Sequence, residues 1–324
     1  MHPFAALPQF KTFAPALAVL LGLNAQANAQ APTRAEYRGN HTFLSSRISE
    51  YKPIFGDCVS DGKRWIAIRQ FKLRGSDTAL VVDPLSLRTE VRAAGKMTCR
   101  KISADFAKTK YGQILESVRR QDSSLWDAGI TRTDFNPHVY LTVDLCPSKK
   151  PFEARFFSWV KEQRAPVALS VSGGWINGHA QEFQWLKDLR QAGVDVTWVN
   201  HSLTHPYVKS LSDKQNFFLL PGVQVRDEIL GNEIKMLENG IVPSVFFRFP
   251  GLISDREIAD EIVSWGLVPL GADAWLALGK KARPGSIILV HGNGNEPRGV
   301  RLFFDDLPSL LRMGFAAITR LPSQ

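Results

Sequence analysis

Two histidines four positions apart, His201 and His205, lie just after an apolar run in the stretch WVNHSLTHPY. Neutral imidazole is a good ligand for zinc and similar divalent ions, so this pair predicts a metal site. The alternative is two loop histidines that are only hydrogen-bonded. A third ligand is usually an oxygen or another histidine. Asp144, which follows a different apolar run, could supply it.

Further residues suited to chemistry also lie at the ends of apolar runs. Arg248 lies near the end of SVFFRF, Asp273 follows LVPLGA, and His291 ends SIILVH. A charged arginine at such a place needs a carboxylate partner, for which Asp144 and Asp273 are candidates. A histidine there can act as a general acid toward a leaving group. The alternatives are a structural ion pair for Arg248 and a hydrogen-bonded core histidine for His291.

From residue 137 onward, short apolar runs alternate with amphipathic helical patterns. Strands are expected at 138–143, 166–171, 194–199, 244–249, 267–272, 286–291 and 315–321. Helices are expected at 152–164, 180–193, 224–240, 255–266 and 301–314. This alternation predicts a parallel sheet covered by helices, either a closed or nearly closed (β/α) barrel or a doubly wound open sheet. In both folds the site lies at the carboxyl ends of the strands, where the candidate residues fall.

The preceding part of the chain has a different pattern. An apolar run at 12–23 is followed by small-x-small cleavage sites, which predicts a signal peptide at 1–29; a membrane anchor is the alternative. Residues 30–136 combine strand patterns with one helix, so we expect a small N-terminal α+β module before a barrel domain at 137–324.

The composition narrows the class of protein. A chain of 324 residues with a net charge of +9 favours polyanionic partners. Nucleic acid is excluded as a partner because the protein is expected to be exported and has no nucleic-acid motif. We expect a periplasmic or secreted protein without stable membrane insertion after signal cleavage. In such an oxidising compartment Cys58 and Cys99 could form a disulfide, which would leave Cys146 over. Oligomeric state cannot be read from the sequence.

Residues from about 138 to 321 resemble the polysaccharide deacetylase family, the NodB-homology carbohydrate esterases. LTVDLCP stands where the family has T-F-D-D-G-P, and HSLTH matches its H-[ST]-x-x-H motif. RFPG, GADAW and ILVH are similar to its arginine, Asp/Trp and Leu-x-His motifs. The resemblance implies a distorted (β/α) barrel of about seven parallel strands. It also implies a hydrolase of carbon–nitrogen, not peptide, bonds that removes acetyl groups from glycans with a divalent metal, commonly zinc.

The resemblance implies a role for each candidate residue. The positions that match the family motifs are Asp144 for the catalytic base, His201 and His205 for the metal ligands, Arg248 for the arginine that holds the base, Asp273 for the carboxylate that tunes the catalytic histidine, and His291 for that histidine, the general acid. The implied substrate is an N-acetylated polysaccharide or oligosaccharide of the cell envelope or an exported polymer.

One position departs from the family pattern, because the second Asp of the motif, a metal ligand, is Leu145 here. Asp144 could be the third ligand, or it could remain the base beside a two-histidine site. The thiolate of Cys146 could also ligate, although its position two residues beyond Asp144 argues against this. Two other functions stay open: a non-catalytic glycan-binding protein on a deacetylase fold, and a hydrolase of another carbon–nitrogen amide bond.

Overall fold

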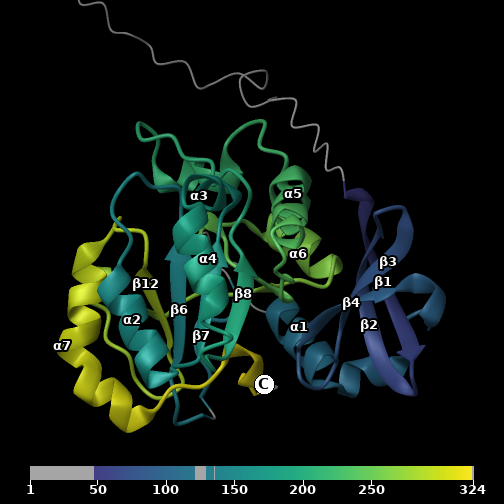
Figure 1. The fold of residues 1–324 in the computed structure, drawn as a ribbon, viewed down its shortest axis with the longest axis horizontal. Helices are drawn as coiled ribbons and strands as arrows, with labels where there is room; N and C mark the ends of the chain where they lie inside the picture. The colour runs from purple at the N-terminus through teal and green to yellow at the C-terminus, as the bar shows by residue number, and fades with distance from the viewer. Residues whose placement is uncertain (1–46, 121–128, 135, 323–324) are drawn as a thin grey trace, which may run out of the picture.

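Two sheets of different kinds organise the chain (Figure 1). The computed structural model describes residues 47–120, 129–134 and 136–322. The expected signal peptide at 1–29 and the first residues of the expected N-terminal module lie outside the described residues. Within the described part, no helix has the length and apolar character needed to cross a bilayer.

The first sheet is antiparallel, with strand order β4-β3-β2-β1-β5. Its strands are β1 (Ile48–Ser60), β2 (Lys63–Leu73), β3 (Ser76–Val82), β4 (Thr89–Ala93) and β5 (Thr98–Arg100). Helix α1 (Lys110–Arg120) follows, in agreement with the expected α+β module. Cys58 of β1 and Cys99 of β5 pair across the sheet and form a disulfide. The expected pairing is therefore present.

The second sheet has seven strands in the order β10-β9-β8-β7-β6-β12-β11, and every neighbouring pair is parallel. Its strands are β6 (Tyr140–Leu145), β7 (Val167–Val171), β8 (Val196–Asn200), β9 (Phe246–Phe247), β10 (Val268–Pro269), β11 (Ala274–Trp275) and β12 (Ile287–His291). This is the expected distorted (β/α) barrel. A short connection closes the gap between β10 and β12, because the Ile130 carbonyl accepts from Gly271 N at 2.8 Å and the Thr131 carbonyl accepts from Ile287 N at 3.3 Å.

One expected strand is wrong, and another was missed. Residues 315–321 form only a single bridge, Val139 to Phe315, followed by a 3₁₀ turn at Ile318–Arg320. The seventh strand is instead the two-residue β11, which directly follows Asp273. Such a short strand has no period of its own in the sequence, because its pairing depends on its neighbour β12.

Helices cover the outer side of the barrel (Figure 1). They are α2 (Ala154–Gln163), α3 (Gly173–Gly178), α4 (Ala180–Asp188), α5 (Val225–Glu238), α6 (Arg256–Ser264) and α7 (Pro297–Met313). Side chains of a strand alternate between its two faces. On β6 the odd-numbered Leu141, Val143 and Leu145 pack in one apolar cluster with Phe156 and Phe157 of α2. The even-numbered side chains, including Asp144, therefore face the barrel interior.

The antiparallel sheet is attached to the barrel through a buried ion pair. Arg69 of β2 donates from Nε and Nη2 to the carboxylate of Glu233 on α5, at 2.6 and 2.8 Å. Tyr51 of β1 donates to the same carboxylate, and Arg69 also donates to the carbonyl of Trp265. Both carboxylate oxygens of Glu233 and all three guanidinium nitrogens of Arg69 have hydrogen-bond partners. These directional bonds fix the antiparallel sheet against α5.

Candidate active site at the carboxyl ends of the barrel strands

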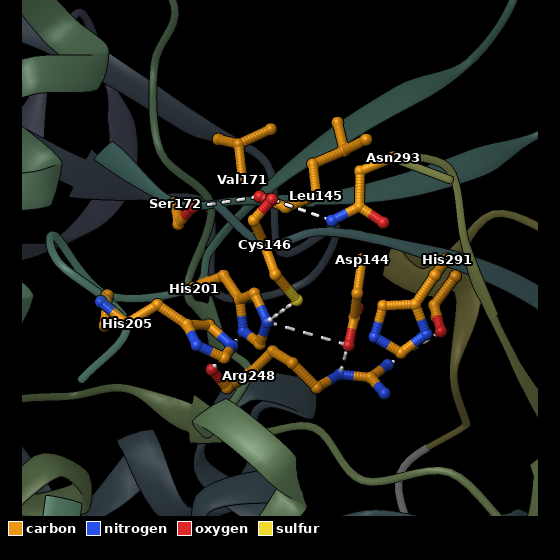
Figure 2. A network of polar contacts seen from close by, with 12 residues as sticks. Asp144, Leu145, Cys146, Val171, Ser172, His201, His205, Arg248, His291 and Asn293 are labelled. Carbon is orange, nitrogen blue, oxygen red and sulfur yellow. Dashed lines mark hydrogen bonds and ion pairs between the residues drawn. The ribbon is translucent and has the colours of Figure 1, made fainter. Parts of the chain in front are cut away.

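The pairing register of the barrel brings the predicted residues to one end of the sheet. His291, the last residue of β12, pairs with Asp144 of β6. Asn200, the last residue of β8, pairs with Phe247 of β9, so His201 and Arg248 leave their strands side by side. Figure 2 shows these side chains converging with His205 on a common space. The residues that the sequence places at strand ends therefore lie together at one end of the sheet.

His201 is held with one ring nitrogen directed into the site. Its Nδ1 lies 2.9 Å from the Arg248 carbonyl oxygen, to which it donates, so Nε2 carries the free lone pair. Nε2 lies 3.4 Å from Cys146 Sγ and 3.8 Å from Asp144 Oδ2. Burial alone would lower the pKa of His201, but Asp144 and Cys146 outweigh it and raise the pKa.

Cys146 lies directly against this histidine, so the sequence argument against it is wrong. Residues two apart on an extended chain point to the same side, which places Cys146 with Asp144. Leu145 points the other way and is fully buried in the apolar cluster beneath α2 (Figure 2). The backbone carbonyl of Cys146 accepts a hydrogen bond from Asn293 Nδ2 at 2.7 Å, which holds this turn of chain in place.

The donor set of Cys146, His201 and His205 fits a divalent metal ion. One ligand atom from each residue lies within 4.8 Å of the other two. His205 Nε2 is buried and has no hydrogen-bond partner among the described residues, as expected of a nitrogen kept for a ligand. Burial alone would raise the pKa of Cys146, but the neighbouring imidazoles hold the pKa well below its ordinary value, which favours the thiolate. A sulfur and two imidazole nitrogens suit zinc.

Asp144 is buried beside this donor set without close partners. Its Oδ1 lies 3.9 Å from Arg248 Nε, too far for a hydrogen bond. Arg248 instead donates from Nη2 to Thr142 Oγ1 at 2.7 Å. Thr142 lies two residues before Asp144 on the same face of β6. The arginine thus supplies positive charge near Asp144 while leaving the carboxylate oxygens open to the site.

The structure does not bring Asp273 to His291. Asp273 accepts hydrogen bonds from Ser286 Oγ at 2.9 Å and from Ile287 N at 3.1 Å, so it anchors the start of β12 rather than its end. Burial raises the pKa of this carboxyl. The prediction from strand ends is wrong for Asp273 because this residue precedes β11. Since β11 and β12 are parallel, Asp273 lies beside the amino end of β12, whereas His291 is at its carboxyl end.

Glu296 takes the place expected of Asp273. Its Oε2 lies 2.8 Å from His291 Nδ1 and accepts from Trp275 Nε1 at 2.7 Å. Burial alone would lower the pKa of His291, but Cys146 and Glu296 raise the pKa well above its ordinary value. Burial would raise the pKa of Glu296, but the contact with His291 lowers it. A sequence signal existed: Glu296 is the first acidic residue after His291.

These groups line one open pocket of about 850 Å³. Its lining includes Asp144, Cys146, the two histidines of the loop and His291, together with Trp275 and Glu296. At the rim, Tyr207 is 54% exposed and packs against Phe217 with ring centroids 5.4 Å apart. The pocket therefore combines polar groups with aromatic side chains, one of which is exposed to solvent.

Comparisons with known proteins found one family model and several solved structures similar to this chain. Residues 132–270 match the family model described as polysaccharide deacetylase. A family 4 carbohydrate esterase from Bacillus anthracis is 17% identical over 64% of this chain and 90% of its own, with a TM-score of 0.46. PdaA from Bacillus subtilis, also a family 4 carbohydrate esterase, is 17% identical over 64% and 88%, with a TM-score of 0.46. A family 4 pseudoenzyme from Bacillus anthracis is 17% identical over 76% and 84%, with a TM-score of 0.45.

The family match and the site geometry concern the same residues. The matched segment contains Asp144, Cys146, both histidines of the 201–205 loop and Arg248, all on barrel strands or on the chain that follows them. Through residues 132–270, this chain is similar to the polysaccharide deacetylase family.

Proposed function

We propose that this protein is a metal-dependent hydrolase that removes N-linked acetyl groups from an exported or cell-envelope polysaccharide. The observation that carries the proposal is the convergence of a metal-ligating set, a buried open carboxylate and a paired histidine on one pocket. Together these groups come from the ends of β6, β8 and β12 and the loops that follow them. Amide hydrolysis needs these functions together: activation of the carbonyl, a base for water and an acid for the leaving nitrogen.

Cys146, His201 and His205 would hold the metal. A divalent ion bound there supplies a Lewis acid that polarises the acetyl carbonyl and favours deprotonation of water. The thiolate takes the ligand position that Leu145 cannot fill, so Asp144 is not needed as a third ligand. Zinc is the ion that this donor set favours.

Asp144 would be the general base. Its carboxylate lies at the bottom of the pocket, 3.8 Å from His201 Nε2, and accepts the proton of the attacking water. Arg248, just after β9, places its Nε 3.9 Å from Asp144 Oδ1 and supplies a positive charge beside the carboxylate. Water oxygen then adds to the carbonyl carbon of the acetamide.

His291 would be the general acid. It lies across the pocket from the histidine loop, and Glu296 holds its Nδ1, so Nε2 is the nitrogen that faces substrate. Its proton passes to the nitrogen as the carbon–nitrogen bond breaks, and acetate and a free amine leave. Trp275 fixes Glu296 in turn through its indole N–H.

The substrate class follows from the pocket and the charge. Tyr207 at the rim and Trp275 on the wall offer flat apolar surfaces of the kind on which sugar rings stack, and Lys150 adds a positive charge at the edge. The net charge of +9 favours an anionic polymer. The non-catalytic glycan-binding alternative rested on Leu145, which packs against helix α2 and leaves the ligand position to Cys146.

The test is elemental analysis of residues 30–324 together with acetate release from an N-acetylated oligosaccharide. We expect about one zinc per chain, loss of zinc and activity in His201→Ala, and weakened zinc binding in Cys146→Ser. A metal-free protein after incubation with excess zinc would contradict the proposal. So would full activity in His201→Ala.

A further inference from the structure

The loop that carries the two histidines has an unfavourable backbone. Ser202 and His205 both have positive φ angles, 68° and 53°, although neither is glycine. Such a backbone conformation is unfavourable for a residue other than glycine and persists only where surrounding contacts hold it. The structure must therefore contain groups that fix this loop in its present shape.

Glu228, near the start of α5, makes the contacts that fix it. Its carboxylate accepts hydrogen bonds from both the backbone N–H and the hydroxyl of Thr204, the former at 2.9 Å. Glu228 is nearly buried, with 9% of its surface exposed. Thr204 immediately precedes His205, so these two bonds restrain the backbone next to the residue with the positive φ angle. A Ser202 Oγ contact at 3.1 Å holds the His205 N–H from inside the loop.

Helix α5 is itself firmly anchored on the same face. Asn232, one turn beyond Glu228, donates to Asn200 Oδ1 at 2.7 Å and to the Val171 carbonyl at 2.9 Å. Asn200 Oδ1 also accepts from Ser202 N at 3.0 Å, so the loop is tied to α5 at its beginning as well as its end. The buried pair between Glu233 and Arg69 joins α5 to the antiparallel sheet.

We propose that Glu228 is a positioning residue for the metal site: by clamping Thr204 to α5, it holds His205 in the left-handed conformation in which its imidazole lies beside Cys146 and His201. Glu228 is outside the pocket lining and touches no reacting atom, so it acts only through the loop. Its effect on metal binding depends on the metal site of the proposed function, whereas its effect on the loop does not.

The experiment compares Glu228→Leu and Glu228→Gln with wild type and with Asp227→Leu in the full chain. Asp227 is an exposed acidic residue in the same first turn of α5, so Asp227→Leu reproduces the loss of charge at the helix start without touching the loop. Two quantities are measured: hydrogen–deuterium exchange of peptides covering residues 200–208 in metal-free protein, and the zinc dissociation constant by competition with a chromophoric chelator.

In Glu228→Leu we expect faster exchange confined to 200–208 and zinc binding weakened about 10- to 100-fold, the range for loss of a group that orients a ligand. Glu228→Gln keeps one acceptor for the Thr204 N–H, so its exchange rate and zinc affinity should lie between those of wild type and Glu228→Leu. Asp227→Leu should match wild type in both quantities. Unchanged exchange in Glu228→Leu, or faster exchange spread over the whole barrel, would overturn the proposal. If wild type binds no zinc, the proposed function fails, and the exchange result still decides the role of Glu228.

Discussion

Two buried aspartates, one in each sheet, lie beside an arginine and have opposite environments. Asp57 of the antiparallel sheet accepts from Arg64 at 2.9 Å with both oxygens and from Ser103 Oγ at 2.8 Å. Asp144 of the barrel has its arginine at 3.9 Å, and its Oδ1 has no hydrogen-bond partner among the described residues. Both are almost fully buried, at 2% and 3% exposure.

This contrast separates a buried charge that stabilises the fold from a buried charge that is available for chemistry. A carboxylate that accepts hydrogen bonds from an arginine and a hydroxyl stabilises the fold and takes up a proton less readily. An open buried carboxylate costs desolvation energy, and such a cost is typical of functional sites. In this protein the antiparallel sheet has the first kind and the pocket the second.

The largest expected effect comes from Asp144→Asn. Removing the proposed base should lower the rate of acetate release by about 10²- to 10⁴-fold. Zinc content and thermal stability should stay near wild type, because no close hydrogen bond is lost. Joint loss of zinc would instead make Asp144 a ligand, and retained activity would remove it from the mechanism. The readouts are acetate release, elemental analysis and the melting temperature.

The next effect is on stability and comes from Glu233→Gln. This variant leaves Arg69 buried without its carboxylate, so the free energy of unfolding should fall by about 3–5 kcal/mol. Urea unfolding measures it. The control is Asp260→Asn in the half-exposed Arg256–Asp260 pair, which should cost at most about 1 kcal/mol. Equal losses in the two variants would contradict the contrast between buried and exposed pairs.

A smaller effect separates the two carboxylates considered as partners of His291. Glu296→Gln should lower the turnover rate about tenfold, a part of the 10²–10⁴ that a positioned acid contributes. Asp273→Asn should change turnover less than about twofold per folded molecule, because its contacts are at the other end of β12. Steady-state kinetics on both variants decide between them, and the reverse ranking would restore Asp273 as the tuning carboxylate.

The smallest effect is a pH dependence of stability from Asp57. Burial alone would raise its pKa, but the hydrogen bonds from Arg64 and Ser103 outweigh burial and lower the pKa. The stabilisation is therefore complete above the ordinary aspartate pKa of about 4 and is lost as the pH falls through the lowered value. Urea midpoints measured downward from neutral pH should fall less steeply in Asp57→Asn than in wild type. Parallel curves would exclude this contribution.

Much of the barrel and most of the site were predictable from local pattern. The runs that became β6, β7, β8 and β12 are short, apolar and followed by polar residues, so both the sheet type and the useful edge could be predicted. The histidine pair, Asp144, Arg248 and His291 were found in this way. The two-residue strands β9 and β10 lie inside the apolar runs expected at 244–249 and 267–272, whereas β11 has too few residues to show a period and was missed. The long β1 carries register shifts that interrupt its alternation.

By itself, the amino-acid sequence determined which residue types could bind metal and move protons, and that they fall at strand ends. Only the tertiary structure decided the partners. Cys146 became a candidate ligand because strand alternation turns it toward His201 and turns Leu145 into the apolar layer. Glu296 became the partner of His291, and Glu228 the clamp on Thr204, through contacts between separate elements. Such contacts depend on how the elements pack, which no local pattern in the chain records.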